Sequence, residues 1–158
     1  MPSPAGTLLL TGRQALESLH FPIGTTRVEP WEGWVEDPGR FKEAQQQLAE
    51  YFNGQRKVFE LDLDPQGTDF QKKVWKQLIK IPYGQTVSYG ELARRIGNPK
   101  ASRAVGMANG RNPISIIIPC HRVIGSNGSL TGFGGGIEVK QYLLDLESRH
   151  SGLFSKEA

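Results

Sequence analysis

The chain has 158 residues, 37% of them apolar and 22% charged, with a net charge of +3 at neutral pH. This length and composition predict a globular, water-soluble protein with one good hydrophobic core or two small ones. A single cysteine excludes an internal disulfide and, beside only three scattered histidines, the usual structural zinc site, so we expect a reducing compartment and no metal.

Residues 1–66 are expected to form a small structural α/β domain. Its start lacks a positively charged region followed by a long apolar stretch, so we expect no signal peptide, no membrane anchor and a cytoplasmic location. Residues 7–11 and 16–21 flank the turn at Gly12-Arg13, a pattern that predicts two short strands. A loop is expected over residues 21–39, which contain three prolines and three glycines.

An apolar stripe with helical spacing follows this loop and predicts a helix that ends at Asn53-Gly54. The stripe consists of Phe41, Ala44, Leu48 and Tyr51. Residues 57–63 alternate apolar and polar side chains, which is typical of a half-buried strand. No side chain of this first domain is expected to take part in chemistry.

A second domain is predicted over residues 67–158, and it begins with a helix. Thr68 and Gln71 have the spacing of a capping box, and a proline-glycine stop over residues 81–84 ends the helix. Four lysines lie mainly outside the predicted buried face, which consists of Phe70, Val74, Trp75, Leu78 and Ile79.

Two short helices joined by a tight turn are expected next. Ser88 and Glu91 have the spacing of another capping box, and the helix that they begin is expected to stop at Gly97. A further helix is expected from Lys100 or the next residue to about Asn109. The pair has the form of a helix-turn-helix, which alone is weak evidence because many helical hairpins bind nothing.

The positive charge of the chain is concentrated around these helices. Residues 67–125 carry ten basic residues against two acids, a net charge of +8, whereas the rest of the chain carries −5. Such a stretch can be only a solvated face, or it can attract a polyanion. In combination with the helix-turn-helix, it favours DNA binding.

The apolar run Ile114–Pro119 predicts a buried, strand-like segment that carries Cys120 to the edge of the core. A lone cysteine there can be only a small buried side chain. It can also be a nucleophile, because His121 can act as a base and Arg122 or a helix N-terminus would favour the thiolate. Adjacent side chains of a strand point opposite ways, so direct contact between them requires a bend or a bridging water. Glu147 is available as an orienting acid.

A glycine-rich segment over residues 125–136 is either a flexible loop or a wall along which a planar ligand approaches the backbone closely. Its glycine spacing differs from that of a phosphate loop. A final helix is expected to carry Glu147 at the margin of its apolar face, and the tail from Ser148 is polar. The apolar face consists of Val139, Tyr142, Leu143 and Leu146.

Five ordered blocks of sequence resemble one known family. They are Pro119–Val123 and residues 81–84, 88–93, 97–106 and 112–113. Together they closely resemble the O6-alkylguanine-DNA alkyltransferases, over a match that runs from Leu48 to Glu147.

This resemblance implies a DNA repair protein that flips a damaged guanine out of duplex DNA. The alkyl group of O6-alkylguanine, or of O4-alkylthymine, would move irreversibly to the protein's own cysteine, so each molecule would act once. The implied protein is monomeric, uses no cofactor, contacts no membrane and binds the minor groove. Some members of the family have a zinc site, but this chain lacks the cysteines for it.

The resemblance also implies a role for each residue at a matching position. Cys120 would be the acceptor, His121 would take its proton through a water, and Glu147 would orient and polarise His121. Asn112 would brace this segment. Tyr89 would donate to N3 of the flipped guanine and so ease its departure.

The matching arginine of the family enters the base stack in place of the flipped base, and here it is Arg103. The implied DNA-binding residues are Arg103, Lys100, Ala101, Ser102, Tyr89, Arg111 and Arg122. The implied substrate pocket consists of Tyr89, Val123, Phe133, Gly134 and Gly135. Some relatives have a tyrosine and a serine in place of Phe133 and Gly134, and we hypothesise that the smaller Gly134 leaves room for adducts larger than methyl.

The implied fold is α/β, of the α+β kind. A small N-terminal domain with a short antiparallel sheet and a helix precedes a mainly helical C-terminal domain, which contains the helix-turn-helix and the Pro-Cys-His-Arg segment. One alternative is a non-catalytic helix-turn-helix lesion sensor or regulator, but relatives that only bind lesions lack the cysteine. The other is a Cys-His hydrolase, which gives no account of Arg103 or the basic helices.

Overall fold

The structure is a computed structural model that describes residues 1–23, 35–130 and 133–151. The predicted loop over residues 21–39, the glycine-rich segment and the polar tail each lie partly outside the described residues. Within these ranges, no helix has the length and apolar character needed to cross a membrane.

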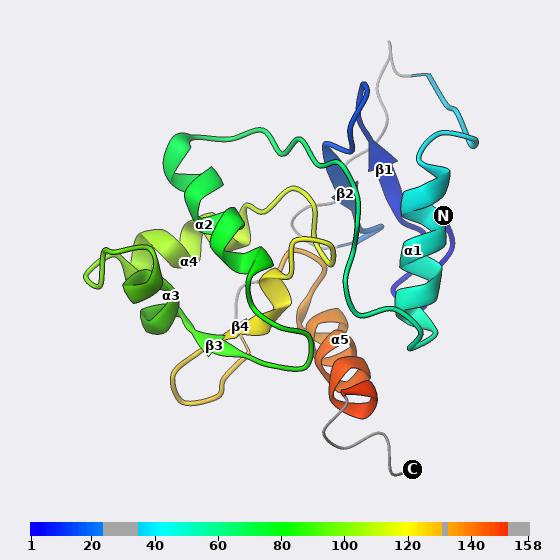
Figure 1. The fold of residues 1–158 in the computed structure, drawn as a ribbon. Helices are drawn as coiled ribbons and strands as arrows, with labels where there is room; N and C mark the ends of the chain where they lie inside the picture. Colours follow the sequence, from blue (N-terminus) through cyan, green and yellow to red (C-terminus); the bar gives the residue numbers. More distant parts are fainter. Residues whose placement is uncertain (24–34, 131–132, 152–158) are drawn as a thin grey trace.

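The N-terminal part contains a short hairpin and one helix, as predicted (Figure 1). Strand β1 (Leu9–Thr11) pairs with β2 (Ser18–His20) in an antiparallel register that places Leu10 opposite Leu19. Helix α1 (Lys42–Phe52) presents its apolar stripe to the core. The strands are short, and Leu19 is the one residue of β2 that is fully buried.

The predicted strand over residues 57–63 is wrong, although its alternation of half-buried and exposed side chains is real. A buried side chain of α1 replaces the neighbouring strand: Gln47 Oε1 accepts from the backbone N–H of Glu60 at 2.9 Å, and its Nε2 donates to the carbonyl of Glu60 at 3.1 Å. Only the end of the segment forms a bridge, between Leu63 and Leu16. The amide side chain therefore satisfies backbone groups that a ladder would otherwise pair.

The C-terminal part begins with α2 (Asp69–Ile79), which starts at the predicted capping box. Thr68 Oγ1 accepts from the N–H of Gln71 at 3.1 Å, and Gln71 Oε1 accepts from the N–H of Thr68 at 2.9 Å. The chain then turns at Gly84, whose φ of 81° is a left-handed conformation that side chains rarely adopt. That turn brings a backbone N–H to the candidate site described below.

Helices α3 (Tyr89–Arg95) and α4 (Ser102–Gly110) form the predicted helix-turn-helix. Ser88 caps α3 by accepting from the N–H of Glu91 at 3.0 Å. The other half of the predicted box does not form, because the Glu91 carboxylate pairs with the two arginines in the last turn of the helix.

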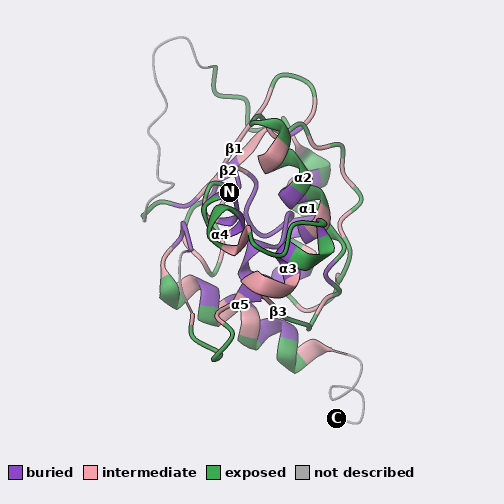
Figure 2. Ribbon diagram, turned by 90° about the vertical axis from the view of Figure 1, so that its left-hand side faces the viewer, coloured by how far each residue is buried: buried purple, intermediate pink, exposed green. Residues whose placement is uncertain are grey.

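Helix α5 (Ile137–His150) packs against a 3-10 turn, η1 (Cys120–Arg122), near the centre of the molecule. The two-residue strands β3 (Val87–Ser88) and β4 (Val123–Ile124) pair in parallel, which ties η1 to the start of α3. One hydrophobic cluster takes residues from both predicted domains, and the buried faces of the helices turn inward around it (Figure 2). The division of the chain at residue 66 stays a prediction.

Candidate active site

The segment before the cysteine is a tight turn, not the strand-like run that the sequence predicts. Asn112 holds it from both ends, because its Oδ1 accepts from the N–H of Ile114 at 3.0 Å and its Nδ2 donates to the carbonyl of Ile118 at 2.7 Å. Ile118 N–H also donates to the carbonyl of Ile114 at 2.9 Å. The turn places the buried Ile116 at a φ of 75°, a strained conformation for a β-branched residue. Asn112 thus braces the segment that leads to Cys120.

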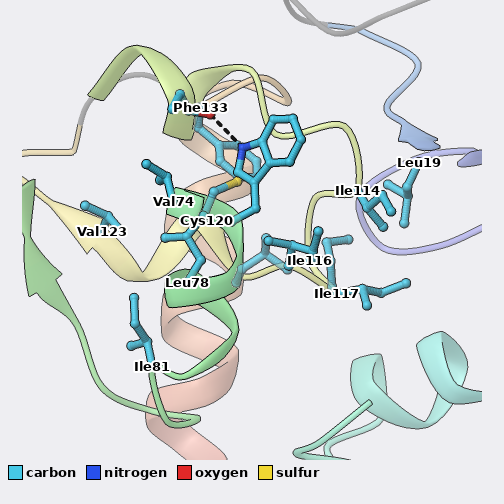
Figure 3. Packing of buried hydrophobic residues seen from close by; sticks show 14 of the residues in the cluster. Leu19, Val74, Leu78, Ile81, Ile114, Ile116, Ile117, Cys120, Val123 and Phe133 are labelled. Atoms are coloured by element: carbon cyan, nitrogen blue, oxygen red, sulfur yellow. Dashed lines mark hydrogen bonds between the residues drawn. The ribbon is translucent and has the colours of Figure 1, made fainter. Parts of the chain in front are cut away.

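Cys120 begins the 3-10 turn and is only 3% exposed, inside the hydrophobic cluster that also holds Val74, Leu78 and Val123 (Figure 3). Its Sγ lies 3.9 Å from the hydroxyl of Ser115. Burial raises the pKa of the Cys120 thiol, and this effect outweighs nearby hydrogen bonds and the positive charge of Lys140. The sulfur therefore rests as a thiol and requires a base to become a nucleophile.

His121, the next residue, supplies an imidazole that is completely buried. Its Nε2 lies 2.6 Å from Glu147 Oε2 on α5. In the tautomer whose Nε2–H donates to this carboxylate, Nδ1 keeps a free lone pair. Nδ1 is buried without a hydrogen-bond partner in the part of the chain that the structure describes. Burial lowers the pKa of His121 despite the opposite effect of Glu147, so the imidazole is neutral and able to accept a proton.

Arg122 pairs with the same carboxylate. Its Nε donates to Glu147 Oε1 at 2.8 Å, its Nη2 to Oε2 at 2.9 Å, and its Nη1 to the carbonyl of Ile81 at 2.6 Å. Burial alone would raise the pKa of Glu147, but hydrogen bonds from His121 and Arg122 and the positive charge of Arg122 hold that pKa well below its ordinary value. Glu147 is therefore a fixed anion that orients His121.

The predicted place of Arg122 on the DNA-binding surface is contradicted by this pairing. Its side chain is buried, and Glu147 and a backbone carbonyl occupy its donors. An arginine within a basic stretch of sequence resembles a surface residue, but here the guanidinium compensates a buried carboxylate.

Two further groups reach Glu147 from elements distant in sequence. Tyr51 of α1 donates its hydroxyl to Oε2 at 2.7 Å across 96 positions of sequence, and Gly84 donates its backbone N–H to Oε1 at 3.2 Å. Sequence reasoning missed Tyr51 and assigned no chemistry to the N-terminal part. Its place on an apolar helical stripe indicates burial alone, and no local signal reveals so distant a partner.

Lys140 is a second residue that sequence reasoning missed. It lies two turns before Glu147 on α5, is completely buried, and donates its Nζ to the carbonyl of Val123 at 2.7 Å. Burial lowers the pKa of Lys140, while the nearby Cys120 raises it. The only available signal was its helical spacing from Glu147, which places both on one face.

The predicted DNA-binding residues of the helix-turn-helix lie at the start and end of α4. Lys100, Arg103 and Arg111 are exposed there, and Ala101 and Ser102 are half-buried. Tyr89, at the start of α3, is half-buried. Its ring lies beside Gly106 of α4, where an added Cβ would be 3.7 Å from the ring.

The predicted pocket wall is buried, and it includes Val123, Phe133, Gly134 and Gly135. The ring of Phe133 lies 5.5 Å from that of Phe21 in the N-terminal part. Gly135 packs so closely on Phe21 that a Cβ would come within 2.7 Å of the ring. In the described ranges, no three His, Cys, Asp or Glu side chains gather as a metal site.

Two family models match the chain, one on each side of the predicted boundary. The model for the 6-O-methylguanine DNA methyltransferase ribonuclease-like domain matches residues 1–65, and that for the DNA binding domain of the same proteins matches residues 69–149. The methylated-DNA–protein-cysteine methyltransferase of Methanosarcina acetivorans is 54% identical over 146 residues, which cover 92% of this chain and 94% of the relative.

Solved structures show the same likeness. The O6-methylguanine methyltransferase of Mycobacterium tuberculosis has 52% sequence identity and a TM-score of 0.88, over 96% of this chain and 92% of its own. OGT of the same organism in complex with DNA has 52% identity and a TM-score of 0.89, over 95% of this chain and 91% of its own. The short antiparallel sheet and the helical C-terminal part of the expected fold are thereby confirmed.

Proposed function

Because this chain belongs to the 6-O-methylguanine DNA methyltransferase family, we propose that it repairs DNA by transferring the alkyl group of O6-alkylguanine to its own Cys120. It is a methylated-DNA–protein-cysteine S-methyltransferase that acts once, because the thioether product is too stable for water to reverse. The observation that carries the assignment to Cys120 is a buried thiol followed directly by a buried imidazole, which a carboxylate orients.

The reaction is a displacement at the alkyl carbon. The Cys120 proton passes through a water to Nδ1 of His121, and a sulfur electron pair forms the new S–C bond. The C–O6 bond breaks, and its electrons remain on the guanine, which Tyr89 protonates at N3. His121 then returns the proton through solvent to Tyr89. The products are an S-alkylcysteine and an unmodified guanine.

The main contribution of the protein is to remove the Cys120 proton as the sulfur attacks the alkyl carbon. The raised pKa of the Cys120 thiol means that a base must act during the attack, and the neutral His121 can do so because Glu147 binds its other nitrogen. The buried Lys140 adds positive charge near the sulfur and favours the thiolate as it forms.

The helix-turn-helix brings the lesion to this centre. Lys100, Arg103 and Arg111 are exposed cations at the two ends of α4, as phosphate binding requires. We place α4 in the minor groove, with Arg103 filling the stack that the flipped O6-alkylguanine leaves. The substrate pocket takes the flipped base beside Val123 and Gly134. We further propose that the protein acts as a monomer in the cytoplasm, without a cofactor.

The decisive test is the intact mass of the protein after incubation with duplex DNA that contains O6-methylguanine. We expect a gain of one methylene, located on Cys120 by peptide mapping and limited to one per protein. The matched control, Cys120→Ala, should bind the same DNA and gain no mass. Tight binding without any gain by the wild-type protein would indicate a lesion sensor instead, and a gain on another residue would refute the assignment of Cys120.

A further inference from the structure

The hydroxyl of Tyr51 belongs to the N-terminal part of the chain but lies in the hydrogen-bond network of the reacting residues. It donates to Glu147 Oε2 at 2.7 Å, the oxygen that also binds His121 at 2.6 Å and Arg122 Nη2 at 2.9 Å. Tyr51 is fully buried, so no water competes for this contact from the surface. Three donors thus share one carboxylate oxygen.

We infer that Tyr51 is a positioning residue for alkyl transfer, which fixes the Glu147 carboxylate and disperses its charge so that His121 stays neutral and correctly oriented. The inference deepens the proposed function, since it assigns part of the proton-transfer machinery to α1. The Tyr51 hydroxyl donates to Glu147, and through that carboxylate it acts on His121.

The charge on the Glu147 carboxylate determines how strongly it stabilises a proton on the imidazole of His121. A carboxylate that loses one donor keeps more charge on its oxygens, and a nearby imidazolium is then more stable. Removal of the Tyr51 hydroxyl should therefore raise the pKa of His121. It should also loosen the carboxylate, because Oε2 would keep only His121 and Arg122 as donors.

The other charged and titratable groups around this pair remain in place when the hydroxyl is removed. They are Tyr83 in the loop after α2, Cys120 and Arg122 in η1, and Lys140 and Arg149 on α5. Arg122 offsets most of the charge of the Glu147 carboxylate. Loss of the neutral Tyr51 donor should therefore raise the pKa of His121 only moderately.

The ring of Tyr51 has a separate, structural role. It packs against Phe52, Phe59 and Tyr83, with ring centroids 5.6, 5.5 and 6.2 Å away. Tyr51→Phe keeps these contacts and removes only the hydroxyl. Tyr83→Phe is a matched control, because the Tyr83 hydroxyl is also buried but has no hydrogen-bond partner among the described residues.

The experiment measures the single-turnover rate of methyl transfer from duplex DNA with excess protein, between about pH 5 and 8. For Tyr51→Phe we expect the acidic limb of the rate profile to move to higher pH by roughly half a unit to one unit, and the rate at the acid end to fall by up to about tenfold. DNA affinity should not change, and Tyr83→Phe should match the wild type in both limb and rate.

A second readout does not depend on alkyl transfer. The imidazole of His121 is titrated by NMR in the wild type and in Tyr51→Phe, and we expect its pKa to be higher in the variant. The inference would be overturned if Tyr51→Phe changed neither the pKa of His121 nor the acidic limb of the rate profile. It would also be overturned if the variant lost rate equally at every pH and a lower unfolding temperature explained that loss. Failure of the wild type to transfer methyl would refute the proposed function, while the NMR result would still decide the role of Tyr51.

Discussion

The guanidinium of Arg122 and the carboxylate of Glu147 meet through two parallel hydrogen bonds in the interior of the protein. Nε and Nη2 lie 2.8 and 2.9 Å from the two carboxylate oxygens, and the residues are 6% and 1% exposed. Desolvation offsets much of the attraction in a buried pair, so its main contribution is a fixed geometry. Here the fixed group is the carboxylate that orients His121.

Glu147→Gln should separate these effects. The change leaves the Arg122 charge buried without an anionic partner, and we expect a loss of about 3 kcal/mol in the free energy of unfolding, measured with urea. The double variant Glu147→Gln, Arg122→Met should recover most of that stability, because it contains neither the buried carboxylate nor the buried guanidinium. Alkyl transfer should stay at least tenfold slower in both variants. Wild-type transfer by the stable double variant would contradict the role of Glu147.

The rate of alkyl transfer should be nearly constant around neutral pH and should fall in acid. Burial lowers the pKa of His121 below its ordinary value of 6.5, so more than half of the molecules hold a neutral imidazole at that pH, and this fraction is lost only as pH falls further. Burial raises the pKa of the Cys120 thiol above 9.0, so little thiolate forms near neutrality. Stopped-flow or quench measurements check this profile. A rate that rises tenfold per unit between about pH 7 and 8.5 would indicate a free thiolate instead.

The same lowered pKa affects stability. Because folded His121 binds its proton more weakly than the unfolded chain does, its contribution to stability is present above pH 6.5 and is lost as pH falls through the folded pKa. We expect the urea midpoint to decrease below pH 6.5, and the decrease to be smaller in His121→Gln. An identical pH dependence in the two proteins would show that other groups cause it.

Arg103→Ala should weaken repair of duplex DNA without changing the chemistry at Cys120. The exposed side chain is lost from the start of α4, so affinity for lesion-containing duplex should fall by roughly tenfold or more. Reaction with the free base O6-benzylguanine should be unchanged. Lys72→Ala, on the outer face of α2, also removes an exposed positive charge and is the control. An equal effect of both variants would mean that Arg103 contributes only its charge.

Gly134 should control the size of the alkyl group that the protein accepts. The residue is buried, and in the proposed pocket a side chain at this position would take space from the adduct. We expect the wild type to transfer benzyl and methyl groups at comparable rates and Gly134→Ser to slow benzyl transfer more than methyl transfer. The comparison uses matched duplexes that carry each lesion. A steep loss of rate with adduct size in the wild type would refute the hypothesis.

Features that depend on neighbours in sequence could be predicted. The capping box of α2 and the helix-turn-helix follow from local patterns, and the arrangement of His121 with Glu147 follows from the motif resemblance. Features set by contacts between distant elements could not. The side chain of Gln47 hydrogen-bonds the backbone N–H and carbonyl of Glu60 in place of a neighbouring strand. Nothing near either residue in sequence indicates that contact. Arg122 was misplaced for the same reason, since only the fold brings a buried carboxylate to it.

The burial of the Cys120 thiol affects how long the protein stays active before it meets a lesion. Soluble oxidants and small electrophiles attack thiolates, and Cys120 rests as an almost inaccessible thiol. Because the proposed transfer occurs once per molecule, any accidental reaction of Cys120 leaves that molecule inactive. Burial therefore protects the Cys120 thiol of the resting molecule from reaction with solutes and preserves it for the alkylated base.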